Sequence, residues 1–196
     1  MNRILVGFHG KLPNVGDFVQ RRLPAGFVDR WDAAIQSALA EASVAVGETW
    51  RDVFLASAPW RFALPANVCG HLPWTGVVAP SHDRVGRVYP LALAVSPSRA
   101  ADGWPQIPAT EWFDALTAAA ARTRDGMDVT MFDALVAMLP DPARSPPQDL
   151  PSIVGIRTRS LWWRDDRLSD GFALPGMPDA AEYLRLLGVE TDEEHV

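Results

Sequence analysis

Residues 7–24 have the sequence GFHGKLPNVGDFVQRRLP, and the rest of the chain is arranged around this stretch. Its three glycines and two prolines predict an irregular backbone path. Large apolar residues are interleaved with charged ones, so we expect this loop to pack onto the core and to hold its charges in fixed places. Gly16 is expected to need a positive φ, which a β-branched residue resists. The candidate site residues in this stretch are Gly10, Lys11, Pro13, Gly16, Asp17 and Phe18.

Hydrophobic periodicity on either side of this stretch predicts helices and strands. The predicted helices span residues 27–46, 48–56, 110–124, 130–139 and 179–187; Gly47 ends the first and Thr110 caps the third. The predicted strands span residues 3–6, 60–64, 74–79, 88–95, 160–163 and 171–174. Residues 74–79 and 88–95 should form one antiparallel hairpin, and the last two strands a second, turning at residues 165–166. This order predicts an α+β fold, a mostly antiparallel sheet with helices on both faces.

The composition predicts a single domain over residues 1–196. The chain is 48% hydrophobic and 21% charged, which is ordinary for a globular protein. The proline-containing residues 140–151 are expected to be a loop rather than a domain boundary, and the acidic tail 190–196 is expected to fray.

The net charge, the absence of long apolar runs and the cysteine content argue against several functional classes for this chain. A net charge of -6 without a basic run argues against nucleic-acid binding. The chain has no long apolar run and no recognisable signal peptide, so membrane insertion is not expected. The single cysteine, Cys69, rules out an internal disulfide and fits a reducing cytoplasm.

Two patterns resemble cofactor or metal sites without meeting their requirements. Gly7–Lys11 follows an apolar run, but a phosphate-binding loop has four residues between its glycines and a Ser or Thr after the lysine. Cys69, His71, His9 and His82 lack the paired spacing of a zinc site. We therefore expect no cofactor and no metal.

Ser81, His82 and Asp83 are the residue types of a hydrolase triad, but a triad is assembled in space and not in a tripeptide. A β-turn, in which serine and aspartate bond nearby backbone, is the favoured interpretation, and no catalytic residue is assigned.

Two further groups of residues have both a structural and a functional interpretation. One is a charged set that either forms an ion network bracing the loops or provides a recognition surface for a partner. The other is Trp162–Trp163, adjacent in a strand and so on opposite faces. Either one of them contacts a partner, or helices cover both faces. The charged set with its turn glycine comprises Lys11, Asp17, Arg61, Asp83, Arg84, Gly86 and Arg87.

Several motifs in order resemble the TagF (ImpM) family of type VI secretion-associated proteins. The start carries Gly-Phe-x-Gly-Lys-Leu-Pro and Gly-Asp-Phe-Val. The middle carries Trp60-Arg61-Phe62 and the segment from Ser81 to Arg87, and residues 160–163 carry Ser-x-Trp-Trp. The resemblance extends from Gly7 to Trp163.

The resemblance implies a cytoplasmic accessory protein that represses type VI secretion post-translationally. It implies association with a forkhead-associated-domain scaffold and with the threonine kinase and phosphatase that regulate it. Alanine substitutions at Trp163 or Arg87 that leave melting unchanged are then expected to weaken scaffold capture and repression together. The alternative is a small hydrolase or ligand-binding domain that uses the Gly10–Asp17 loop and the Asp83–Arg87 turn.

Overall fold

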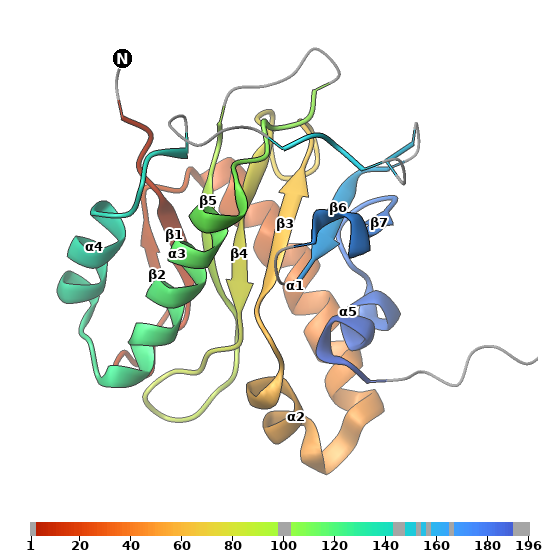
Figure 1. Ribbon diagram of the computed structural model, residues 1–196. Helices are drawn as coiled ribbons and strands as arrows, with labels where there is room; N and C mark the ends of the chain where they lie inside the picture. The colour runs from red at the N-terminus through yellow and green to blue at the C-terminus, as the bar shows by residue number, and fades with distance from the viewer. Residues whose placement is uncertain are drawn as a thin grey trace, which may run out of the picture.

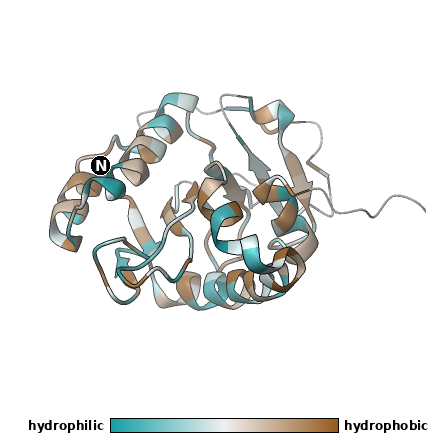
Figure 2. Ribbon diagram, turned by 90° about the horizontal axis from the view of Figure 1, so that it is seen from below, coloured by the Kyte–Doolittle hydropathy of each residue, from teal (hydrophilic) through white to brown (hydrophobic). Residues whose placement is uncertain are grey.

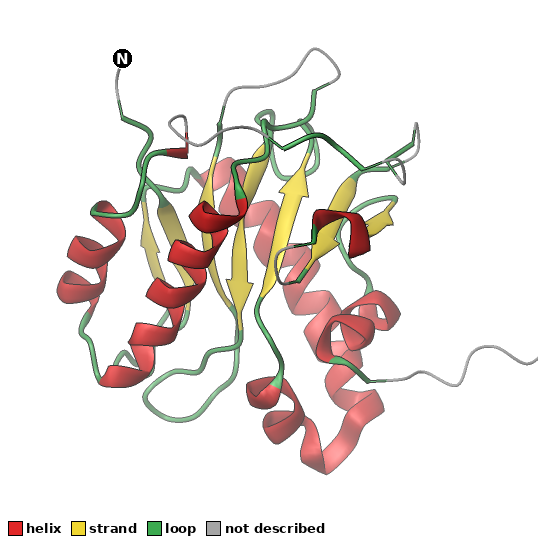
Figure 3. Ribbon diagram, viewed as in Figure 1, coloured by secondary structure: helices red, strands yellow, loops and turns green. Residues whose placement is uncertain are grey.

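The computed structural model of the protein describes residues 3–97, 103–142, 148–151, 154–155, 158–164 and 167–189. Within these ranges the strands form one sheet with the order β2-β1-β5-β4-β3-β6-β7, and every neighbouring pair is antiparallel (Figures 1 and 3). The strands are β1 Gly7–Gly10, β2 Val19–Arg21, β3 Trp60–Leu64, β4 Trp74–Ala79, β5 Leu91–Val95, β6 Ser160–Trp163 and β7 Phe172–Leu174. The α-helices are α1 Ala25–Val46, α2 Trp50–Ala56, α3 Thr110–Ala121, α4 Val129–Ala137 and α5 Ala180–Leu187.

Helices cover both faces of the sheet. Leu91, Leu93 and Val95 of β5 pack with α3 and α4, while the alternate residues Ala92 and Ala94 pack with α1, α2 and α5. This two-residue alternation is what a strand between two helical layers requires. Figure 1 shows α3 and α4 in front of the sheet and α1 behind it, and Figure 2 shows hydrophobic and hydrophilic segments alternating along the helices. The predicted α+β fold is therefore confirmed.

The adjacent tryptophans of β6 are divided between the two cores. The Trp162 ring lies 5.6 Å from that of Phe62 on the α1 side, and Trp163 meets Phe113 of α3 edge-on at 5.1 Å. Both are fully buried, with 0% and 1% of their surfaces exposed. The idea that one of them contacts a partner is wrong, because helices cover both faces.

Several predicted boundaries match the structure. β3, β4 and β6 begin and end at the predicted residues. Helix α1 ends before Gly47, which has a φ of 73° and therefore suits glycine. The second hairpin is also formed, since β7 pairs with β6.

Four local predictions are corrected. The first strand is β1, Gly7–Gly10, and not residues 3–6, because the glycine-containing segment pairs with both β2 and β5. Helix α3 begins at Thr110 with Ala109 at the N-cap, so Thr110 is inside the first turn. Strand β5 begins only at Leu91, because Pro90 cannot donate to the ladder. The α-helical part of the 110–124 segment stops at Ala121 and continues as a 3-10 helix, Arg122–Asp125.

The predicted turn at residues 165–166, the predicted tail 190–196 and part of the 140–151 loop lie outside the described residues. No helix within the described ranges is long and apolar enough to cross a membrane.

Candidate functional site

Two loops meet at one end of the sheet. Strand β1 leads into residues 11–18, and β4 leads through residues 80–90 into β5; we call these two segments the loop pair. Because β5 is antiparallel to both β1 and β4, the loops leave the sheet at the same end. Gly10 makes this meeting possible: its φ is 141°, and a Cβ there would lie 2.2 Å from the carbonyl oxygen of Pro90.

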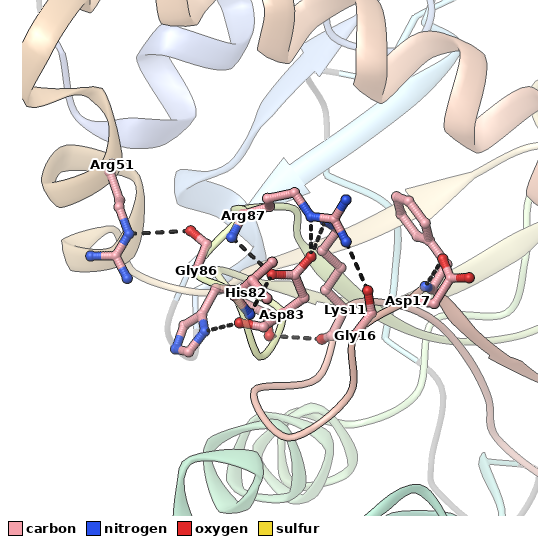
Figure 4. A network of polar contacts seen from close by, with 11 residues as sticks. Lys11, Gly16, Asp17, Arg51, His82, Asp83, Gly86 and Arg87 are labelled. Atoms are coloured by element: carbon pink, nitrogen blue, oxygen red, sulfur yellow. Dashed lines mark hydrogen bonds and ion pairs between the residues drawn. The ribbon is translucent and has the colours of Figure 1, made fainter.

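A buried carboxylate holds the loop pair together (Figure 4). Asp83 Oδ2 accepts hydrogen bonds from Lys11 Nζ at 2.7 Å and from Arg87 Nε at 2.6 Å. Asp83 Oδ1 accepts from the backbone N–H groups of Val85 and Arg87 at 3.1 and 2.9 Å. We call Lys11, Asp83 and Arg87 the ion cluster. It fixes the first loop to the second and shapes the 83–87 turn, in which Gly86 has a φ of 89°.

The Asp83 side chain is completely buried. Burial by itself would raise the pKa of this carboxyl, but the hydrogen bonds from Lys11 and Arg87 outweigh burial and hold the pKa well below its usual range. Asp83 is therefore a fixed anion, and it is not suited to exchanging a proton near neutral pH.

Further bonds join the two loops through their backbones. Ser81 Oγ donates to the carbonyl of Lys11 at 2.7 Å, the Arg84 N–H donates to that of Val15 at 2.9 Å, and Arg87 Nη2 donates to that of Gly16 at 2.7 Å. Gly16 does not have a positive φ, so the reason predicted for this glycine is wrong. It lies beside two arginines instead: a Cβ on Gly16 would sit 3.4 Å from Arg84 Nη2.

Ser81, His82 and Asp83 do not form a relay. The Ser81 hydroxyl bonds to the Lys11 carbonyl, His82 Nδ1 lies 2.8 Å from the carbonyl oxygen of Asp83, and the Asp83 carboxylate binds cations. Asp83 bonds to the backbone of its own turn, as the sequence favoured, whereas Ser81 bonds to the backbone of the other loop and not to nearby backbone.

The remaining predicted residues divide into several environments. Arg61 bonds to Asp114 of α3 at 2.6 Å and lies over the Phe113 ring, so it is not part of the ion cluster. Asp17 is exposed and accepts from the Phe18 N–H. Pro13 is half-buried in the first loop.

A second polar cluster was not predicted from the sequence. His9 Nε2 of β1 lies 2.7 Å from Asp32 Oδ1 of α1, and the Tyr89 hydroxyl donates to the same oxygen. Phe18 covers this cluster, with its ring stacked on His9 at 5.7 Å and edge-on to Tyr89 at 4.8 Å. The available signal was Asp32 itself, a carboxylate among the apolar positions of α1, which implies a buried polar partner.

The contacts within this second cluster shift the pKa values of Asp32 and Tyr89 in opposite directions. Burial raises the pKa of the Asp32 carboxyl, but the hydrogen bonds from His9 and Tyr89 bring it below its ordinary value. Burial, reinforced by the neighbouring Asp32 carboxylate, raises the pKa of the Tyr89 hydroxyl, which keeps it a donor. His9 Nδ1 is buried and has no hydrogen-bond partner among the described residues.

Cys69 is not placed with other metal ligands. It is buried on the α1 side of the sheet, and its Sγ lies 3.6 Å from Met177 Sδ. No group of three or more His, Cys, Asp or Glu side chains suited to a metal occurs in the described part of the chain.

The comparisons agree with the residue motifs. The TagF N-terminal domain family, described as type VI secretion system-associated, matches residues 7–139. The crystal structure of PA0076 from Pseudomonas aeruginosa PAO1, at 2.05 Å resolution, is similar with a TM-score of 0.76 and 31% sequence identity. The match covers 97% of this chain and 96% of that one. A search of curated proteins finds no match.

Proposed function

We propose that this chain, which belongs to the type VI secretion-associated TagF N-terminal domain family, is a non-catalytic protein that represses type VI secretion after translation. Family membership supports the accessory role in secretion. The proposed partner is a forkhead-associated-domain scaffold in the cytoplasm, and the kinase and phosphatase pathway that regulates this scaffold is the second proposed point of contact. Repression would then act either by sequestering the scaffold or by altering its phosphorylation.

The structure of the loop pair supports a binding role over a catalytic one. The Asp83 carboxylate is engaged by Lys11 Nζ, by Arg87 Nε and by two backbone N–H groups. A general base must instead be free to take a proton in the pH range of the reaction. The ion cluster therefore serves to build a rigid surface, and rigid surfaces lose little entropy on binding.

One observation favours the alternative of a hydrolase or ligand-binding domain. His9 is oriented by Asp32, and its Nδ1 has no partner within the described ranges. A carboxylate-oriented imidazole is the usual form of a general base. The Ser81 hydroxyl, however, donates to the Lys11 carbonyl, and no hydrogen bond joins it to this imidazole in the described structure.

Graded expression of the protein in its host tests the proposal. Deleting the gene should raise basal export of the secretion tube protein into the medium, and increasing the protein level should suppress export in proportion to dose. The purified protein should capture the scaffold from cell extract at a fixed stoichiometry. Repression that is complete at trace levels, far below the scaffold's copy number, would contradict stoichiometric binding.

A His9→Gln variant separates the two functions. Glutamine keeps a side-chain amide that can donate to Asp32 but cannot act as a general base. On the binding proposal this variant represses secretion like the wild type, provided that its melting is preserved. Loss of repression in a His9→Gln protein that still captures the scaffold would favour the catalytic alternative.

A further inference from the structure

Three arginines surround the 83–87 turn. Arg51 of α2 donates from Nε to the carbonyl of Gly86 at 3.2 Å (Figure 4). Arg87 Nη2 donates to the Gly16 carbonyl. The Arg84 guanidinium lies beside the same glycine, with Nη2 3.4 Å from the position that a Cβ on Gly16 would take. Arg51 of α2 and the two arginines of the second loop thus bring their guanidinium groups to one small surface.

This surface carries more positive charge than its own carboxylate can balance. Asp83 is buried between Lys11 and Arg87 and neutralises only one of those two cations. Arg51 and Arg84 add two more, in a chain whose net charge is -6. The exposed Asp17 is the acidic residue of the first loop, and it is bonded to its own neighbour's backbone. The side chains of Lys11, Arg51, Asp83, Arg84 and Arg87 together therefore carry a net positive charge, opposite in sign to that of the whole protein.

Two of the three arginines, Arg51 and Arg87, are also held in position by side-chain hydrogen bonds. The Arg87 side chain is 63% exposed, yet two of its N–H groups bond to Asp83 and Gly16, which leaves the outer edge of the guanidinium facing solvent. An arginine fixed in this way can bind a carboxylate through paired hydrogen bonds with little further loss of entropy. Val85 at the tip of the turn is 68% exposed and adds an apolar contact point.

We infer that the arginine surface, formed by Arg51, Arg84 and Arg87 with Val85 at its tip, binds an acidic segment of the protein partner. The charge selects carboxylates, and Val85 selects an apolar side chain next to them. The inference rests on the proposed function only in naming the scaffold as the protein that carries this segment. Nucleic acid is the less suitable polyanion, because the protein's overall negative charge repels it over longer distances.

A fluorescently labelled poly-glutamate peptide tests the surface directly, with a poly-glutamine peptide of equal length as the neutral comparison. Wild-type protein should bind the acidic peptide, more weakly as salt is raised, and should not bind the neutral one. Arg84→Glu should weaken binding by about tenfold or more, because it replaces an attraction with a repulsion. Arg84 is suitable because its side chain is exposed and the loop contact that it makes uses its backbone N–H.

Arg30→Glu on α1 is the matched control, since it makes the same change of charge at another exposed arginine. Equal weakening by Arg30→Glu and Arg84→Glu would overturn the inference, because binding would then follow net charge alone. Displacement of the peptide by inorganic phosphate at low concentration would overturn the assignment to carboxylates. Unchanged melting of both variants is required for the comparison.

Scaffold capture by the same variants keeps this inference separate from the proposed function. If wild type and Arg84→Glu capture the scaffold equally, the arginine surface is not the contact, although the proposed function stands. If the wild type binds the acidic peptide through Arg84 but captures no scaffold, the proposed function fails and the acidic-segment surface stands.

Discussion

Lys11 and Asp83, 72 residues apart in the chain, form a buried ion pair in which Lys11 Nζ lies 2.7 Å from Asp83 Oδ2. Lys11 is the single lysine of the sequence. Its side chain is 7% exposed and that of Asp83 is 0% exposed, so neither charge is well hydrated. The pair therefore depends on its mutual attraction and on the other bonds to Asp83. Because it joins the two loops, it determines the shape of the surface that they form.

Asp83→Asn should destabilise the protein by about 3–5 kcal/mol, because it leaves the Lys11 charge buried without its counterion. Lys11→Met should destabilise the protein less, since Asp83 still accepts hydrogen bonds from the Arg87 side chain and from two backbone N–H groups. Urea unfolding with an unchanged m-value measures both differences. The control is Arg122→Ala in the exposed Arg122–Asp125 pair, which should remain near the wild type. An Asp83→Asn protein as stable as this control would contradict the role of the ion pair.

The stability of the protein should fall in acid in a way that depends on Asp83. Burial alone would raise the pKa of this carboxyl, but its bonds to Lys11 and Arg87 place the folded-state pKa below the unfolded one. A depressed folded-state pKa contributes stability that is fully present above the unfolded pKa of about 4 and is lost as the pH falls toward the folded value. The pKa of the Asp32 carboxyl is also lowered in the folded protein, so protonation of Asp32 adds to the loss of stability in acid. Urea unfolding at several pH values should show a shallower decline below about pH 4 for Asp83→Asn than for the wild type. Parallel curves for the two proteins would contradict this assignment.

Most of the sheet was predictable because its strands are rich in β-branched and aromatic residues with clear ends. Trp60–Leu64 and Trp74–Ala79 are bounded by prolines or turn residues, and their limits match the structure. Strand β1 was not predicted, because Gly7 and Gly10 at its ends are typical of a loop. Its strand geometry comes from pairing with β5, a long-range contact that local pattern does not contain.

The candidate site was predictable only in part. The sequence placed Lys11, Asp83 and Arg87 in one charged set, and the structure joins them. The sequence also placed Arg61 there, but Arg61 pairs with Asp114 on α3. Which carboxylate an arginine reaches depends on how helix and sheet pack, and residue type gives no information on this.

Gly10→Ala should be far more harmful than Gly16→Ala. At Gly10 the φ of 141° and the 2.2 Å approach of a Cβ to the Pro90 oxygen combine strain with a clash against backbone. The strain alone costs about 1–3 kcal/mol. At Gly16 the added Cβ would meet only the end of the flexible Arg84 side chain, at 3.4 Å. Thermal melting of both variants measures the difference, and equal melting temperatures would refute it.

Cys69 should be unreactive in the folded protein. Burial raises the pKa of its thiol to about 12, so almost no thiolate, the reactive form, is present at pH 8. Titration with a thiol-specific chromogenic reagent should give no rapid reaction in buffer and one equivalent in denaturant. Rapid labelling of the native protein would show that the α1 side of the sheet opens readily.

Trp163→Ala should destabilise the protein rather than selectively remove a contact, so it does not meet the condition of unchanged melting that the test of scaffold capture requires. Trp163 is 1% exposed and packs edge-on against Phe113, so truncation to alanine leaves a large cavity between β6 and α3. Substitutions of this kind cost about 3–5 kcal/mol. Trp163→Phe keeps an aromatic ring against Phe113 and should lose less. Urea unfolding of the two variants measures the order of these effects.

Any loss of repression by Trp163→Ala should follow its loss of folded protein and be recovered in part by Trp163→Phe. The contradicting outcome is a Trp163→Ala protein that has the stability of the wild type but does not capture the scaffold. Trp163 would then contact the partner directly, and the conformation that binds would differ from the one in which α3 covers Trp163.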